Sequence, residues 1–190
     1  MQTKNSSLGD RFAEVTVVVV TVIALLAGWM FKSSVENRSV SFDVNGISGQ
    51  TPAGWLQAQV QDDEVLHTLD ISSGDFSTAY VVRKFPVAAD TPFGQIASLL
   101  TLERGQQLTA FRVLDQKRVT VAGREAYEIS YVFVESDPNL THAQLPVVVR
   151  GVDTIFINGD QAVVATYWAG AENFELDLSR FQLFLKSLKF

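Results

Sequence analysis

The first strong pattern along the chain is an apolar run near the N-terminus that has no polar face. From Val15 to Phe31 it contains no charge, and extending it to Phe12 gives about 20 residues with Glu14 as their only charged group. A helix of this length covers the roughly 30 Å of a bilayer core and satisfies its own backbone in lipid. We therefore expect a transmembrane helix over residues 12–31, anchored by Phe12, Val15, Val18, Val22, Leu25, Leu26, Trp29 and Phe31.

Short polar segments flank this run: an N-terminal tail over residues 1–11 and a linker over residues 32–38. The tail carries the α-amino group, Lys4 and Arg11, whereas the linker carries two basic side chains and no other cation. This small bias favours an N-terminus inside the cell. We therefore expect a single-pass protein of the cell membrane whose large C-terminal part is extracytoplasmic.

Two other interpretations of the N-terminus stay open. The run could be a cleaved signal peptide, although it exceeds the usual signal core and no small-x-small site follows it. Gly9, followed five residues later by Glu14, also resembles type IV prepilins, in which a glutamate is the fifth mature residue. Asp10 and Arg11 depart from that pattern, because the family has apolar or small residues there.

Beyond residue 38 the pattern changes to short stretches of alternating apolar and polar residues, which is typical of strands with one buried face. Ser39–Val44 is the first, with its three apolar residues on the expected core face, and the glycine-containing residues 45–54 indicate a loop. Ala122-Gly123 and Asn158-Gly159 are turn signals that predict hairpins. The other predicted strands are Trp55–Gln61, Val65–Ile71, Ser77–Phe85, Phe111–Val121, Arg124–Glu135, Pro146–Ile157 and Gln161–Ala169.

Two segments have the three-to-four-residue apolar spacing of helices packed on one face. Thr91-Pro92 begins the first, because threonine can cap a helix and proline suits its first turn. The apolar stripe of this first helix is Phe93, Ile96, Leu99, Leu100 and Leu108. The second helix ends the chain, with the stripe Phe174, Leu178, Phe181, Phe184, Leu185 and Leu188. Together these elements predict an α+β domain over residues 39–190, an antiparallel sheet flanked by helices.

The composition shows that the apolar excess of the chain comes from the N-terminal run, and it excludes some classes of protein. The mean hydropathy is +0.14 although 19% of residues are charged. Without the apolar run the average falls to about −0.1, as in an ordinary soluble domain. The absence of cysteine excludes disulfides and thiol nucleophiles, and 18 acidic against 11 basic residues over 39–190 argue against a nucleic-acid binder.

Residues that could act in catalysis or bind a metal ion are few and far apart in the sequence. His67 and Asp70, three apart in a predicted strand, point to opposite faces, and His142 lies in a loop close to Asp137. The acidic triplet Asp62-Asp63-Glu64 is expected to face water in a turn. No phosphate-binding glycine loop or nucleophile elbow occurs. We therefore expect no catalytic, cofactor-binding or metal-binding residues, and no enzyme.

Several short phrases of the sequence occur in a familiar order: the first strand, Pro52-Ala53-Gly54-Trp55, the hairpin Val121-Ala122-Gly123-Arg124-Glu125-Ala126-Tyr127 and the closing Phe181–Phe190. These phrases resemble the PsbP-like/Mog-like superfamily, which includes the photosynthetic PsbP, Ran-binding Mog proteins and DcrB-type envelope proteins. The resemblance covers residues 39–190 and implies an antiparallel sheet flanked by helices, in proteins that mostly bind or stabilise partners.

These observations favour a non-catalytic accessory or assembly subunit of a larger membrane complex, with photosynthetic and respiratory complexes as candidates. Tethering at the membrane raises the effective concentration of the domain near other subunits. A tethered envelope domain that binds a small ligand or lipid is the first alternative, and a prepilin-like subunit is the second.

Overall fold

A computed structural model describes residues 8–36, 38–88, 90–136 and 145–190, and within the first helix it describes side chains from Val15 to Met30. The chain divides into two compact units, 1–39 and 40–190. Each unit is described by itself below.

The first unit contains one helix, α1, over Leu8–Glu36. All its described side chains are exposed, from Val15 to Met30, and Trp29 is 69% exposed. Thr21 donates its hydroxyl to the carbonyl of Val17 at 2.9 Å, which satisfies that polar group inside the helix. Within the residues that the structure describes, no helix is long and apolar enough to cross a membrane. The transmembrane segment 12–31 stays a prediction, and Phe12, Glu14 and Phe31 lie outside the described side chains.

The second unit is built on a seven-stranded sheet in the order β3-β4-β5-β9-β8-β7-β6, with every described neighbour antiparallel. The two longest hairpins, β6–β7 and β8–β9, form where the turn signals predict them. The strands are β3 Leu56–Gln57, β4 Glu64–Asp70, β5 Thr78–Pro86, β6 Thr109–Val121, β7 Arg124–Glu135, β8 Val147–Asn158 and β9 Gln161–Gly170.

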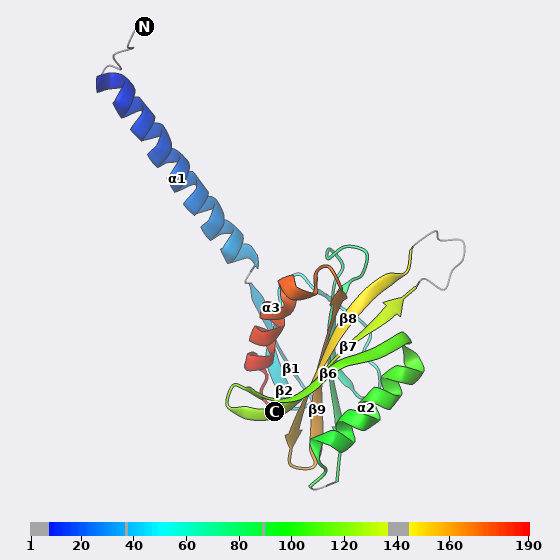
Figure 1. Cartoon of the computed structure of the whole chain (residues 1–190). Helices are drawn as coiled ribbons and strands as arrows, with labels where there is room; N and C mark the ends of the chain where they lie inside the picture. The colour runs from blue at the N-terminus through cyan, green and yellow to red at the C-terminus, as the bar shows by residue number, and fades with distance from the viewer. Residues whose placement is uncertain (1–7, 37, 89, 137–144) are drawn as a thin grey trace. The chain divides into compact units, whose positions relative to one another are not determined.

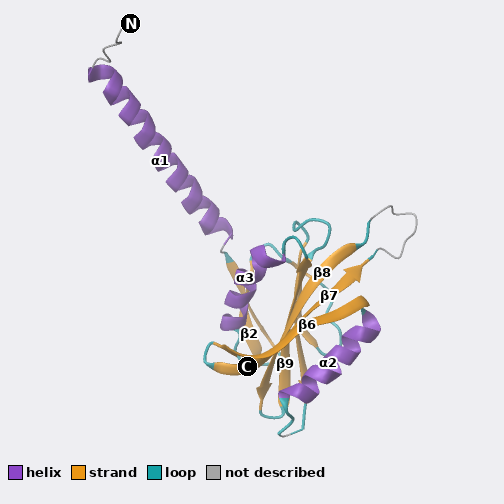
Figure 2. Cartoon of the chain, viewed as in Figure 1, coloured by secondary structure: helices purple, strands orange, loops and turns teal. Residues whose placement is uncertain are grey.

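Helices cover opposite faces of this sheet, so the domain has three layers (Figures 1 and 2). Alternate residues of β9 show the division: Ala165 and Tyr167 join the core beneath helix α3, Phe174–Ser187. Ala162 and Val164 join the core beneath helix α2, Phe93–Gln107. This architecture confirms the predicted α+β fold of an antiparallel sheet flanked by helices.

A second, two-stranded sheet lies on the α3 side and was only half predicted. Its strand β1, Ser39–Val44, has the predicted bounds. Of the three apolar residues expected on the core face, only Phe42 packs on the core, and Val40 is 55% exposed. Its partner β2, Ile47–Pro52, lies in the segment predicted as a loop. This position in the strand requires glycine, because a Cβ atom on residue 49 would stand only 2.9 Å from the ring of Phe42. The predicted strand Trp55–Gln61 shrinks to the two residues of β3.

The N-terminus of α2 also differs from the prediction. Pro92 is the N-cap residue, and no side chain caps the helix. The hydroxyl of Thr91 instead donates to the carbonyl of Ala88 at 2.7 Å, which closes the preceding turn. The buried face is made by Ile96, Ala97, Leu100 and Arg104, whereas Leu99 is 58% exposed.

Candidate functional site

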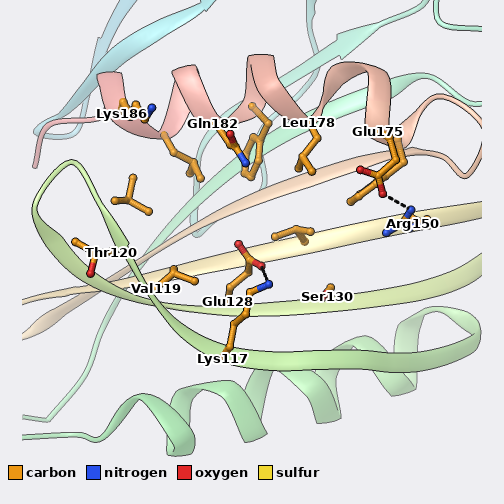
Figure 3. Close-up of a pocket in the computed structure, with 15 residues that line it drawn as sticks. Lys117, Val119, Thr120, Glu128, Ser130, Arg150, Glu175, Leu178, Gln182 and Lys186 are labelled. Atoms are coloured by element: carbon orange, nitrogen blue, oxygen red, sulfur yellow. Dashed lines mark hydrogen bonds and ion pairs between the residues drawn. The ribbon is translucent and has the colours of Figure 1, made fainter.

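A groove lies on the α3 side of the sheet, between α3 and strands β6, β7 and β8 (Figure 3). Its volume is about 510 Å³, within the range of ligand and peptide sites. Seven of its lining residues are apolar: Val119, Val121, Val152, Phe174, Leu178, Phe181 and Leu185. Eight are polar: Lys117, Thr120, Glu128, Ser130, Arg150, Glu175, Gln182 and Lys186.

The groove exists because α3 packs over one part of the sheet and leaves the neighbouring part open. Phe181 and Leu185 are buried beneath the helix, and the Tyr167 ring packs against Phe181 with ring centroids 5.1 Å apart. Strands β6 and β7 extend for 13 and 12 residues, and the tip of their hairpin brings Val119 and Val121 against the α3 core. The floor is therefore apolar and supported from below by the core.

Two ion pairs fix side chains along the wall (Figure 3). Arg150 of β8 contacts Glu175 in the first turn of α3 at 2.7 Å, and its guanidinium lies 4.0 Å from the centre of the Phe174 ring. Lys117 of β6 contacts Glu128 of β7 at 3.1 Å. The hydrogen bond and charge of Glu128 raise the pKa of Lys117 above its ordinary value, so this ammonium stays charged.

Four polar side chains of the groove form no hydrogen bond or ion pair with any other described residue: Thr120, Ser130, Gln182 and Lys186. Gln182 and Lys186 are four residues apart on α3, which places them on one face of the helix. The amide of Gln182, the hydroxyl of Ser130 and the ammonium of Lys186 thus stand beside an apolar floor, whereas Thr120 alternates with Val119 and Val121 and turns its hydroxyl to the other face of β6. This combination suits a chain that offers both apolar side chains and hydrogen-bonding groups.

The opposite face holds a buried polar cluster beneath α2, and it is occupied by its own contacts. Arg104 lies 3.3 Å from Asp153, and Thr166 and Tyr131 donate hydroxyls to the same carboxylate at 2.6 and 3.1 Å. The indole of Trp168 donates to the Tyr131 oxygen at 2.7 Å. Burial and then the charge of Asp153 raise the pKa of Tyr131 well above its usual value. These groups are satisfied and enclosed, so the cluster stabilises the fold.

The residues singled out from the sequence do not assemble into a chemical site. His67 lies 3.4 Å from Glu64, while Asp70 accepts hydrogen bonds from Ser72. Asp63 does not simply face water as expected: Arg83 binds it at 2.6 Å. Within the described residues, no three histidine or acidic side chains are grouped as a metal site would require. Asp137 and His142 lie outside the described residues.

Sequence patterns alone did not single out the groove. Its polar residues come from β6, β7, β8 and α3, which are distant along the chain. The usable signal was weak: Gln182 and Lys186 are polar residues that border the apolar stripe of the last helix. Only their approach to Ser130 across the groove makes them a site.

Comparisons with known proteins identify the fold. No protein-family model matches the chain, and no curated protein matches it. The solution structure of cyanobacterial PsbP (CyanoP) from Synechocystis sp. PCC 6803 matches with a TM-score of 0.59 and 11% identity, covering 80% of this chain and 91% of that one. The Ran-binding protein Mog1p of Saccharomyces cerevisiae matches with a TM-score of 0.52 and 11% identity, covering 80% and 95%.

A third similar structure is LpqN of Mycobacterium tuberculosis, which is involved in cell envelope biogenesis. It matches with a TM-score of 0.52 and 9% identity, covering 80% of this chain and 90% of that one. At sequence identities this low, structural similarity shows the fold and does not show the function. The domain therefore has the fold of PsbP-like and Mog1-like proteins, a group whose members have varied roles.

Proposed function

We propose that this chain, whose domain has the PsbP-like and Mog1-like fold, is a non-catalytic accessory subunit that is tethered to a membrane and binds a partner protein through the α3 groove. The observation that carries the proposal is the groove itself. It pairs a supported apolar floor with three polar side chains that have no described partner, Ser130, Gln182 and Lys186. An interface has the same composition, an apolar centre within a polar rim.

The groove favours binding over catalysis. Its lining contains no histidine, and its two carboxylates, Glu128 and Glu175, are each held by a basic side chain. Its hydroxyls, Thr120 and Ser130, therefore have no neighbouring base free to activate them. Binding without a covalent or proton-transfer step is what these side chains can do.

Tethering is proposed from the apolar run over residues 12–31. The described part of α1 exposes apolar side chains on every side, among them Val17 at 65% and Leu25 at 69%. Such a helix is stable in hydrocarbon, where its side chains are covered and its backbone bonds are internal. The slight positive bias before the run supports a domain on the extracytoplasmic side.

The related folds are consistent with a protein partner. Mog1p is a Ran-binding protein, and CyanoP is a cyanobacterial PsbP. LpqN, involved in cell envelope biogenesis, extends the fold to the cell envelope. We infer from these roles that the domain fold serves well as a docking module, and we assign this chain a membrane-complex partner on that basis.

Filling the groove tests the proposal. Gln182→Trp places an indole in the groove, while Leu183→Trp places the same indole on a residue that is 62% exposed and does not line it. Both tagged full-length variants and the unaltered chain are extracted from native membranes with mild detergent. We expect the recovery of co-purifying proteins to fall by about tenfold or more for Gln182→Trp alone, which corresponds to about 1.4 kcal/mol of binding.

Other results would redirect the assignment. A free monomer for the unaltered chain on native gels, without any co-purifying protein, contradicts an accessory role. Lipid recovered in place of protein, and lost in Gln182→Trp, favours a lipid-binding domain. Mass spectrometry decides the prepilin alternative, because a mature chain that starts at Asp10 supports it and a retained Met1 or Gln2 excludes it.

A further inference from the structure

We infer that the partner presents to the groove a short extended segment with apolar side chains and one acidic side chain, which pairs with Lys186. This inference rests on the proposed function and specifies the chemistry of the partner. It follows from three properties of the lining: its charge, its unused hydrogen-bonding groups and its length.

The charge of the groove is opposite in sign to that of the domain. Its lining has three basic residues and two acidic ones, whereas residues 39–190 as a whole have an excess of acid. Lys117 and Arg150 are neutralised by their partners Glu128 and Glu175. Lys186 has no such partner among the described residues, so it is the cation that a ligand can neutralise.

The position of Lys186 favours an acidic group that the partner supplies. It lies in the last turn of α3, where the negative end of the helix dipole favours a cation and disfavours an acidic neighbour from the same helix. Since no carboxylate of the described residues pairs with Lys186, the acidic group that neutralises it comes from the partner. Complementary charge of this kind guides encounter and sets the register of a bound segment.

The hydrogen-bonding groups favour a peptide over an acyl chain. Gln182 offers an amide that both donates and accepts, and Ser130 offers a hydroxyl on the facing strand β7. A peptide backbone provides the matching groups at regular intervals, whereas an acyl chain would leave both without a partner. Leu178 and Val119, both partly buried, provide the apolar surface between them.

The length of the groove sets the size of the segment. From Glu175 to Lys186 the helix rises about 16 Å, at 1.5 Å per residue. An extended chain covers that distance with about five residues. Successive side chains then point alternately to the floor and to solvent, so two or three apolar residues contact the floor.

Photo-crosslinking in native membranes identifies the segment. The full chain carries a diazirine-bearing lysine analogue in place of Gln182, because its flexible aliphatic chain does not fill the groove as an indole does, and a second chain carries it in place of the outward-facing Leu183. After irradiation, we expect a peptide cross-linked only from position 182, with Asp or Glu among alternating apolar residues. A cross-link only to lipid, or to a peptide without an acidic residue, overturns the inference.

Charge reversal tests the role of Lys186 separately. Lys186→Glu and Lys189→Glu make the same change three residues apart, and Lys189 does not line the groove. We expect partner recovery to fall about tenfold for Lys186→Glu alone, and to return when the acidic residue of the cross-linked peptide is changed to lysine. Equal recovery from both variants overturns the inference. If Gln182→Trp still abolishes recovery in that case, the proposed function stands without it.

Discussion

At the scale of single residues, the most consequential feature is the ion pair of Arg104 and Asp153 beneath α2. Both groups are nearly inaccessible, with 5% and 1% of their surfaces exposed. Burial has the largest single effect on the pKa of Arg104 and lowers it, but the charge and hydrogen bond of Asp153, together with the nearby Tyr131 and Glu103, raise that pKa above its ordinary value. Arg104 also lies 4.9 Å from the centre of the Trp168 ring. Each charge therefore depends on the other to remain buried.

Removing one charge of this pair should destabilise the domain strongly. We expect Arg104→Met to lower the free energy of unfolding by about 3–5 kcal/mol, because Asp153 is left buried and uncompensated. Adding Asp153→Asn should recover more than half of that loss, since the amide oxygen still accepts from Thr166 and Tyr131. Urea unfolding of the three chains measures both effects, and a double variant no more stable than Arg104→Met contradicts this account.

Gly151 on β8 is a second residue whose identity is dictated by packing. A Cβ atom there would overlap the Tyr131 ring and stand 2.9 Å from Trp168 Cδ1. The Tyr131 ring cannot move away easily, because its hydroxyl is held by Asp153 and Trp168. The glycine is needed for space, and its backbone conformation is ordinary.

Two alanine substitutions should therefore have opposite effects. We expect Gly151→Ala to lower the free energy of unfolding by about 1–3 kcal/mol through overpacking. Gly94→Ala, in α2 with no atom near its added Cβ, should raise it by about 0.5–1 kcal/mol. Chemical denaturation compares them, and a neutral Gly151→Ala shows that the Tyr131 cluster can shift.

At the scale of elements, α3 has two faces with different roles. Phe174, Phe181, Phe184 and Leu185 are buried on the sheet, and this face matches the apolar spacing found in the sequence. A second edge, with Gln182 and Lys186, forms the wall of the groove. Helix α3 is therefore both a core element and one side of the candidate site. The way it packs on the sheet determines the width of the groove.

Substitutions on the two faces of α3 should separate these roles. We expect Phe181→Ala to cost about 3–5 kcal/mol, because it leaves a cavity among Tyr80, Tyr167 and Phe184. Leu176→Ala, at a residue that is 73% exposed, should change stability by less than about 0.5 kcal/mol. Thermal unfolding followed by tyrosine fluorescence tests this, and similar losses for both variants contradict the packing described for α3.

At the scale of the whole molecule, the chain combines two units with different surfaces. Residues 1–39 expose apolar side chains on α1, whereas residues 40–190 enclose a core on each face of their sheet. The negative net charge of the chain also lies in the second unit, which has 18 acidic and 11 basic residues, whereas the first has three acidic and four basic. The two units are thus suited to different surroundings, and the second has a core of its own.

Deleting residues 1–38 should release the domain without unfolding it. We expect the shortened chain to appear in the supernatant after carbonate washing of membranes, and to unfold in urea at the same midpoint as the full chain in the same detergent. Val22→Lys in the full chain is a milder test, since a charge there costs about 2.5–3.5 kcal/mol of insertion. Retention of the shortened chain in the pellet places the anchor elsewhere.

Most elements of the domain could be predicted from local patterns, and the failures have physical causes. Both long hairpins follow from short turn signals, and the last helix follows from a repeat of four, three, four and three residues. Strand β2 was missed because Gly46 and Gly49 signal a loop, whereas Gly49 is there to make room for Phe42. Leu99 was predicted on the buried face of α2 but is exposed. The prediction failed because that face includes Arg104, a residue whose hydropathy predicts exposure.

The sequence by itself determined the apolar N-terminal run, the α+β class and the acidic balance of the domain, because each depends on composition or on neighbours along the chain. The tertiary structure alone decided which polar residues meet. Arg104 met Asp153, and Gln182 and Lys186 came to face Ser130 across a groove. Such encounters depend on how α2 and α3 seat on a twisted sheet, which is settled by packing between distant segments and leaves no local pattern.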